Sequence, residues 1–177
     1  MKLEDRIARL EAIEAIKALK SRYFHACDRK QPEQVRACFA EGPIDLRYGR
    51  VGNFSDREEM VAVFTELACN DHIVEMHHGQ NPQITIIDED HATATWGLYY
   101  HMIDTRRQTA TQLGGLYDDD YRRIAGEWLI TRSHYEVVST RILDLSTDRV
   151  GVVFAGAVAP THLDDPSAQA DPSSRNS

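Results

Sequence analysis

The chain has 177 residues, of which 42% are hydrophobic and 27% charged, a composition typical of a single globular domain. Its formal net charge of -8 opposes phosphate backbones, and no basic stripe interleaved with aromatic residues favours nucleic acid. The amino terminus has no apolar leader and no apolar run nears the length of a membrane span, so we expect a cytoplasmic protein without membrane contact.

The cysteine pattern and the missing motifs exclude several kinds of chemistry. Cys27, Cys38 and Cys69 are odd in number and show no CxxC spacing, which argues against a disulfide framework or a zinc site. The sequence contains no Gly-rich phosphate loop, no GxSxG elbow and no HExxH motif. We therefore expect neither a metal nor a cofactor.

The first part of the chain is predicted to be helical. Between residues 3 and 27, apolar residues recur at steps of three and four, which predicts one buried face along a long helix. Asp28 follows at its end, where the helix dipole disfavours an acid, so this residue is either a solvated helix end or kept for another use. Pro32 is predicted to open a second helix that runs through Phe39.

The rest of the chain is predicted to be mainly β. Residues 44–48 alternate as a short strand, and Ser55 with Glu58 forms a capping box for a third helix. Four longer strands are expected at residues 76–87, 92–104, 109–124 and 128–138, joined by tight turns. Helices followed by an antiparallel meander indicate an α+β fold, in which the helices cover one face of a curved sheet.

Two features point beyond a simple monomer. Residues 92–104 carry large apolar side chains on both faces of the expected strand, which favours a homo-oligomer such as a dimer or trimer. We expect the domain to span residues 1–140, an apolar extension at 141–163 to dock on a partner subunit, and a polar tail at 164–177 to be disordered.

The residues that carry candidate chemistry are Tyr23, Asp28 and His77. A carboxylate that meets a histidine fixes the tautomer of the ring and stabilises its protonated form, the combination needed to remove a proton from carbon. His78 points to the opposite face of the same strand, and Pro82 disturbs the alternation, so the residues alone do not decide between the two histidines. A tyrosine such as Tyr23 on the apolar face of a helix is, taken alone, more often a core residue with its hydroxyl at the rim.

Three stretches, at residues 13–28, 76–86 and 114–128, resemble the SnoaL-like family of the nuclear transport factor 2-like superfamily. Within that superfamily the sequence is most similar to bile acid 7α-dehydratase and more distantly to scytalone dehydratase. The resemblance implies a cone-shaped barrel of N-terminal helices packed into a strongly curved sheet. It also implies the catalytic set Tyr23, Asp28, Tyr48 and His77. One position departs, because Val137 stands where the dehydratase has an arginine.

The resemblance implies a cofactor-independent dehydratase acting on a bulky hydrophobic carbonyl compound such as a steroid, a polyketide or an aromatic catabolite. His77 would be the base, Asp28 would stabilise its imidazolium, and tyrosines would donate hydrogen bonds to the carbonyl or the leaving group. The sequence leaves open whether coenzyme A carries the substrate. The alternatives are an isomerase with the same base, or a non-catalytic small subunit or ligand-binding module like the β subunit of ring-hydroxylating dioxygenases.

Further residues are expected to line the substrate cavity or to reach its mouth. His101 is an alternative pocket base, because a strand residue in the meander can face the cavity. The other expected substrate-binding residues are Asn81, Trp96, Leu113 and Tyr117, and Arg132 or His134 could reach the mouth.

Overall fold

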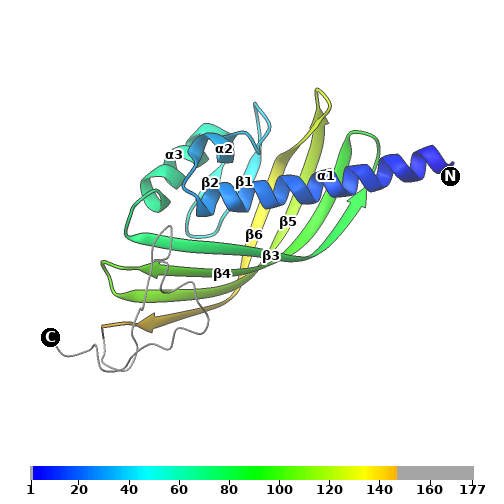
Figure 1. Cartoon of the computed structure of the whole chain (residues 1–177). Coiled ribbons are helices and arrows are strands. Elements are labelled where there is room, and N and C mark those ends of the chain that lie inside the picture. The colour runs from blue at the N-terminus through cyan, green and yellow to red at the C-terminus, as the bar shows by residue number, and fades with distance from the viewer. Residues whose placement is uncertain (1, 147–177) are drawn as a thin grey trace, which may run out of the picture.

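The computed structural model describes residues 2–146, in which three helices pack against one six-stranded sheet (Figure 1). The helices are α1 (Leu3–Asp28), α2 (Pro32–Arg36) and α3 (Arg57–Ala68). The strands are β1 (Asp45–Arg47), β2 (Asn53–Phe54), β3 (Ile73–Ile86), β4 (His91–Asp104), β5 (Thr109–Ile124) and β6 (Glu127–Asp144). The predicted α+β fold class is confirmed. None of the helices within these residues is long and apolar enough to cross a membrane.

The sheet has the strand order β2-β1-β6-β5-β4-β3. Strands β3 to β6 form the predicted antiparallel meander, whereas β1 runs parallel to β6, so the sheet is mixed. Strand β6 continues to Asp144, past the domain boundary expected at residue 140. The docking extension and disordered tail expected farther on fall mostly on residues 147–177, which lie outside the described part of the chain.

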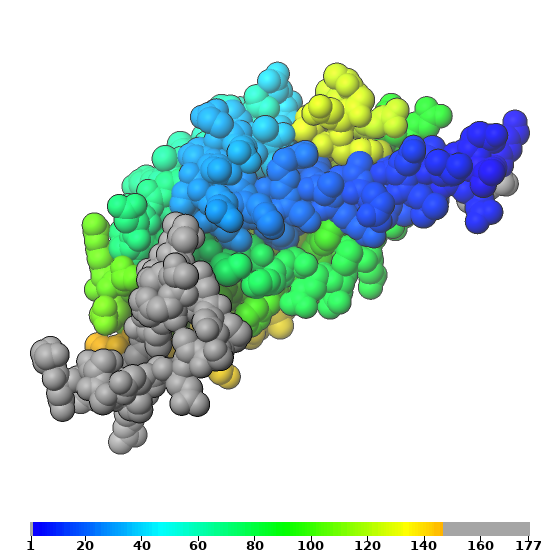
Figure 2. Space-filling model, viewed as in Figure 1, coloured from blue at the N-terminus to red at the C-terminus, as the bar shows by residue number. Residues whose placement is uncertain are grey.

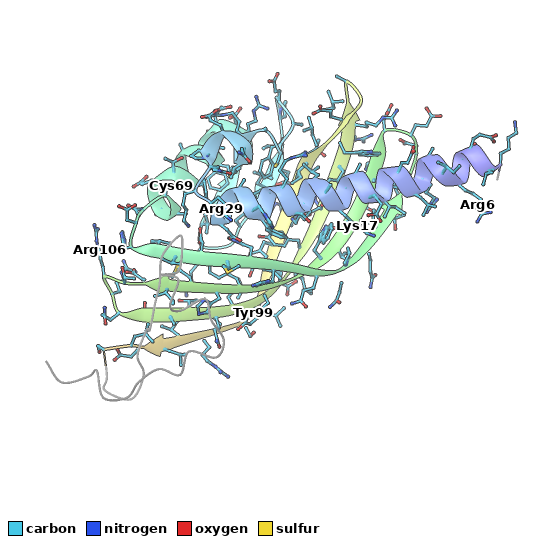
Figure 3. All side chains as sticks on the ribbon, viewed as in Figure 1. Arg6, Lys17, Arg29, Cys69, Tyr99 and Arg106 are labelled. Carbon is cyan, nitrogen blue, oxygen red and sulfur yellow. The ribbon has the colours of Figure 1, made fainter. Side chains whose placement is uncertain are left out.

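The curved sheet wraps its concave face around α1 (Figure 1). Along β4, alternate residues from Ala92 to Leu98 are buried in the core, as the period of two in a strand requires. Tyr99 takes the other parity, is 42% exposed and lies on the face turned away from α1 (Figure 3). The register between β3 and β4 shifts between Gln80 and Gln83, which confirms that Pro82 disturbs the strand.

Helix α1 buries only its carboxyl-terminal half. The predicted apolar face is buried from Ile16 onward, but Leu3, Ile7 and Leu10 are each about half exposed or more. A helix of 26 residues is roughly 39 Å long, and its first turns project past the sheet (Figure 2). The expectation of one buried face along the whole helix was therefore wrong for these turns.

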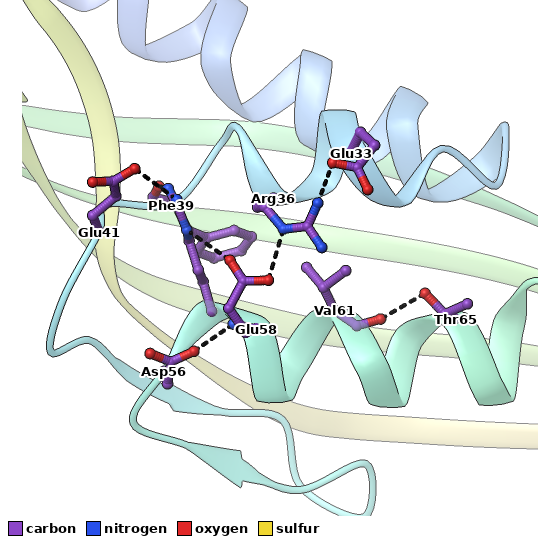
Figure 4. Close-up of polar contacts among 9 residues, drawn as sticks. Glu33, Arg36, Phe39, Glu41, Asp56, Glu58, Val61 and Thr65 are labelled. Carbon is purple, nitrogen blue, oxygen red and sulfur yellow. Dashed lines mark hydrogen bonds and ion pairs between the residues drawn. The ribbon is translucent and has the colours of Figure 1, made fainter.

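Helices α2 and α3 close one end of the cone and are tied together by polar contacts (Figure 4). Arg36 pairs with Glu33 on its own helix, and its Nε donates to Glu58 of α3 at 2.8 Å. The predicted capping box is corrected, because the residue that caps α3 is Asp56, whose carboxylate accepts the Glu58 N–H at 2.6 Å. Helix α2 also ends at Arg36, earlier than predicted, because the chain turns to meet β6.

Candidate active site

His77 and Asp28 meet at the junction of α1 and β3. The Nδ1 atom of His77 lies 2.6 Å from Oδ1 of Asp28, and the His77 backbone N–H donates to the same carboxylate at 3.1 and 3.2 Å. Both side chains are largely buried, with 14% and 16% exposure. A carboxylate accepts only, so the ring must present N–H at Nδ1 and leave Nε2 with its lone pair or a second proton.

Local structure explains how two residues so far apart in the chain come together. Asp28 is the last residue of α1, and its carboxylate reaches past the helix end to the edge strand β3. The ring of Phe24, one turn earlier, stacks on the His77 ring with centroids 5.6 Å apart and planes 10° apart. Gly79 permits this stack, because a Cβ there would come within 2.4 Å of the Phe24 ring. The His77 imidazole is thus fixed in two ways, by the hydrogen bond between its Nδ1 and Asp28 and by the Phe24 ring stacked on its face.

A cavity of about 300 Å³ opens beside this pair, between α1, α3 and the concave face of the sheet. His77 and Tyr23 line it, whereas Asp28 stands behind His77 and is not part of the wall. Most of the wall is apolar or aromatic, supplied by Cys27, Val51, Met60, Phe64, Leu67, Ala68, Ile73, Leu98, Met102 and Leu113. A concave, mostly apolar site with a few polar groups is the usual form of a small-molecule site.

The predicted tyrosines lie in this cavity. Tyr23, Tyr48 and Tyr117 all line it, and each is less than 10% exposed. Burial raises the pKa of all three phenols, so they are protonated at neutral pH and can act as hydrogen-bond donors. Their rings pack edge to face or tilted on neighbouring aromatic rings, which fixes their orientation.

A carboxylate that was not predicted from the sequence, Glu75, lies in the cavity wall. Glu75 is 8% exposed and lies two residues before His77 on β3, so both side chains face the same side. Its carboxylate accepts a hydrogen bond from the Tyr100 hydroxyl at 2.6 Å and pairs with the ammonium of Lys30. The shared parity with His77 was the signal that could have found it.

Lys30 reaches Glu75 from an unusual backbone position. It follows α1 with a φ of 57°, the left-handed conformation that usually favours glycine after a helix. The Gln31 N–H bonds back to the Ala26 carbonyl and the Lys30 N–H to Cys27, which together close the helix end. The lysine at this position places a cation against the otherwise buried charge of Glu75.

Three of the expected cavity residues lie elsewhere. Asn81 is exposed at the register shift of β3, where its φ of 51° turns it out of the strand pattern. Trp96 is in the core and donates its indole N–H to the Tyr121 hydroxyl at 3.0 Å. His101 lies between Tyr100 and Met102, which line the cavity, so strand alternation directs it to the other face. Leu113 and Tyr117 do line the cavity, as expected.

Two residues proposed for the cavity mouth instead belong to a polar cluster on β1, β5 and β6. His134 bonds to Asp45 at 2.7 Å through Nε2, and its Nδ1 lies 3.1 Å from Arg132. Arg132 also pairs with Asp118 at 2.8 Å. Val137, at the position where the sequence departs from the dehydratase, is 47% exposed and is not part of the cavity wall.

A fully buried ion pair lies next to the cavity wall and was also missed. Lys20 donates to Asp119 at 2.7 Å, and the same carboxylate accepts hydrogen bonds from Ser133 at 2.6 Å and Tyr121 at 2.7 Å. The Lys20 ammonium lies 3.7 Å from the centroid of the Tyr117 ring. This cluster therefore packs against Tyr117, which is part of the cavity wall. Across residues 2–146, no three His, Cys, Asp or Glu side chains are grouped to hold a metal ion.

Comparisons with solved structures show the same fold. A candidate scytalone dehydratase from Novosphingobium aromaticivorans is 19% identical with a TM-score of 0.71, over 86% of this chain and 99% of that chain. A type 2 hexachlorocyclohexane dehydrochlorinase is 15% identical with a TM-score of 0.73, over 85% and 97%. A candidate aromatic ring hydroxylase from Novosphingobium aromaticivorans is 20% identical with a TM-score of 0.64, over 81% and 94%.

The family assignment rests on sequence. The model of the SnoaL-like domain matches residues 8–134, from within α1 to within β6, and includes His77 and Asp28. The chain therefore belongs to the SnoaL-like domain family.

Proposed function

We propose that this protein is a cofactor-independent lyase that eliminates water from a hydrophobic carbonyl compound. The observation that carries the proposal is the His77 ring, held by Asp28 at 2.6 Å and lining a largely apolar cavity. Two of the structural neighbours are named for elimination, one as a dehydratase and one as a dehydrochlorinase.

In the proposed reaction, Nε2 of His77 removes a proton from the carbon beside the carbonyl group. The electron pair of that C–H bond forms an enolate, whose oxygen accepts hydrogen bonds from Tyr23 and Tyr48. The enolate then re-forms the carbonyl while the bond to the β-hydroxyl breaks. The departing hydroxide takes a proton from the imidazolium and leaves as water, which restores neutral His77. Asp28 stabilises the imidazolium between these steps.

The cavity narrows the substrate class. A volume of about 300 Å³ is at the lower end of small-molecule sites, which span roughly 300–1,000 Å³. We therefore favour an aromatic or polyketide-derived compound of one or two fused rings over a full steroid. The apolar wall supplies affinity, and the tyrosines and His77 supply orientation.

The proposed reaction is tested by comparing substrate turnover by the wild type with turnover by variants of His77, Asp28 and His78. β-Hydroxy ketones of one or two rings are incubated with the protein, and products are analysed by mass. We expect a product lighter by one water, no turnover by His77→Ala, strongly reduced turnover by Asp28→Asn, and normal turnover by His78→Ala, whose ring points to the other face. Activity that survives both His77→Ala and Asp28→Asn would contradict the proposal.

An isomerase is the second candidate, because the same base can move a proton from one carbon to another without expelling a hydroxyl. The product mass separates the two reactions, since isomerisation leaves it unchanged. A non-catalytic subunit is disfavoured by the cavity, which side chains would fill if its only role were structural.

We also propose that the protein is a homo-oligomer. Apolar side chains on the convex face of the sheet are uncovered, including Tyr99 and Leu116 at 42% and 51% exposure. A second copy of the chain would cover them. Light scattering during size-exclusion chromatography should give a mass of at least two chains, and a monomer at micromolar concentration would contradict this.

A further inference from the structure

Two tyrosine hydroxyls in the cavity wall have no hydrogen-bond partner within the described residues. These are the hydroxyls of Tyr48 and Tyr135, and each oxygen atom exposes less than 1 Å² of surface, to the cavity as well as to bulk solvent. Both side chains line the cavity. Leaving a buried hydroxyl without a partner costs about 1–3 kcal/mol, so such groups call for an explanation. A small shift of either side chain would bring its hydroxyl to the cavity surface, where a ligand oxygen would supply the missing partner.

Tyr135 is seated in a notch of the neighbouring strand. A Cβ at Gly115 on β5 would come within 2.4 Å of both the hydroxyl oxygen and Cε2 of Tyr135, so only glycine leaves room for the ring. The register between β5 and β6 shifts at this point, between Gly114 and Gly115. The shift places one extra residue in β6 and turns the strand locally, as bulges do near functional sites. Sequence reasoning did not single out Tyr135.

Both unpartnered tyrosines pack against the ring of Tyr117. The Tyr135 ring lies 4.7 Å from the Tyr117 ring, and the Tyr48 ring lies 6.3 Å from it on an edge-to-face contact. Phenylalanine at position 135 would make the same ring contacts, so packing does not account for the hydroxyl. Burial raises the pKa of the Tyr135 phenol to about 12, which keeps it protonated as a donor at neutral pH.

We propose that Tyr135 is a substrate-binding residue whose hydroxyl, together with that of Tyr48, donates hydrogen bonds to oxygen atoms of a carbonyl compound in the cavity. The inference rests on the proposed function and deepens it, because it adds Tyr135 to Tyr23 and Tyr48 as a donor that would polarise the carbonyl and hold the enolate oxygen during proton removal by His77. It specifies an oxygen-bearing ligand, and a pure hydrocarbon would leave both hydroxyls unsatisfied.

The experiment measures binding and therefore does not depend on turnover. The probes are 2-acetylnaphthalene, which carries a ketone, and 2-ethylnaphthalene, which has nearly the same shape and no oxygen. Dissociation constants are measured for the wild type, for Tyr135→Phe and for the control Tyr99→Phe, whose ring lies on the other face of the sheet. The carbonyl stretching frequency of the bound ketone is recorded by infrared difference spectroscopy.

Loss of one hydrogen bond should weaken ketone binding by roughly three- to tenfold in Tyr135→Phe and leave hydrocarbon binding within about twofold. The carbonyl stretch should move to higher frequency, and Tyr99→Phe should match the wild type. Gly115→Ala should reproduce the frequency shift, because the added methyl group displaces the Tyr135 ring.

Three results would overturn the inference. One is an unchanged ketone affinity and carbonyl frequency in Tyr135→Phe. Another is an equal loss of affinity for the ketone and the hydrocarbon, which would indicate a packing role. The third is failure of the wild type to bind the ketone. If the ketone binds as expected but no elimination is found, the proposed reaction fails while the assignment of Tyr135 stands.

Discussion

Replacing Lys20 by methionine should destabilise the protein strongly, because it breaks a buried ion pair. The Lys20 and Asp119 side chains are 1% and 0% exposed and lie 2.7 Å apart. Without the ammonium, Asp119 keeps hydrogen bonds from Ser133 and Tyr121 but remains a buried charge with no cation. Removing one partner of such a pair typically costs about 3–5 kcal/mol.

The same reasoning predicts strong coupling between the two positions. Asp119→Asn alone should also destabilise, since it leaves the Lys20 ammonium buried without a counter-charge. The double variant Lys20→Met, Asp119→Asn removes both charges, so it should lose about 1–3 kcal/mol less than the sum of the two single changes. Methionine retains much of the lysine volume, so the comparison isolates the charge.

Urea unfolding at neutral pH, followed by tryptophan fluorescence and far-ultraviolet circular dichroism, measures the three free energies. The account predicts a Lys20→Met loss above about 2 kcal/mol and a clear departure from additivity. A Lys20→Met loss below about 1 kcal/mol, or additive effects within about 0.5 kcal/mol, would refute the claim that the pair acts as one buried unit.

Three further predictions concern the core and the support of His77. The free energy of unfolding should fall as the pH rises above about 10, because burial raises the tyrosine pKa values in the folded state and the unfolded chain therefore loses its phenol protons first. Each such tyrosine contributes a slope of about 1.4 kcal/mol per pH unit. Urea unfolding between about pH 8 and 11 measures this slope, and a flat profile would contradict the prediction. The tyrosines concerned are Tyr23, Tyr48, Tyr117 and Tyr121. Gly79→Ala should lower the free energy of unfolding by about 1–3 kcal/mol, because the added methyl group forces the Phe24 ring away from the His77 ring. The NMR signals of the His77 ring should change, and an unchanged signal would argue against the stack. A thiol reagent should modify Cys69 in the folded protein before Cys27 and Cys38, which are buried, and equal rates at all three would contradict the packing.

Much of the fold could be predicted because its signals are local. The apolar spacing of α1 and the alternation of β3 to β6 follow directly from the periods of helix and strand, and the structure confirms these elements with shifted ends. The exposed start of α1 could not be predicted, because periodicity shows which face is apolar and says nothing of how far the sheet extends beneath it. The true cap Asp56 lies next to the predicted Ser55, and only backbone geometry separates them.

The residues of the site likewise divide into those that the sequence could indicate and those that depend on the pairing of the strands. His77 and Asp28 were singled out through the resemblance, and the structure places them in contact. Glu75, Tyr135 and the Lys20–Asp119 pair depend on which strands are neighbours and in which register, which no local pattern records. The expectation for His101 failed although the alternation along its strand was read correctly, because the face of the cavity was not yet known.

Val137 does not line the cavity, so the departure from the dehydratase at this position does not change the cavity wall. It lies opposite Gly115, next to the β5–β6 register shift, whereas Tyr135 two residues earlier on the same strand lines the cavity. Strand β6 thus carries a tyrosine hydroxyl at a position the sequence comparison did not indicate.

Hydrogen exchange tests most directly whether His77 acts as a base toward carbon acids in the cavity, and it requires no knowledge of the natural substrate. 2-Acetylnaphthalene is incubated with the protein in D₂O, and deuterium uptake at its methyl group is followed by NMR. The account predicts exchange above the buffer rate with the wild type and with His78→Ala, a reduction of about 10²-fold or more in the enzyme-dependent rate with Asp28→Asn, and the buffer rate with His77→Ala. Exchange by His77→Ala at the wild-type rate, or none by the wild type despite binding of the ketone, would contradict it.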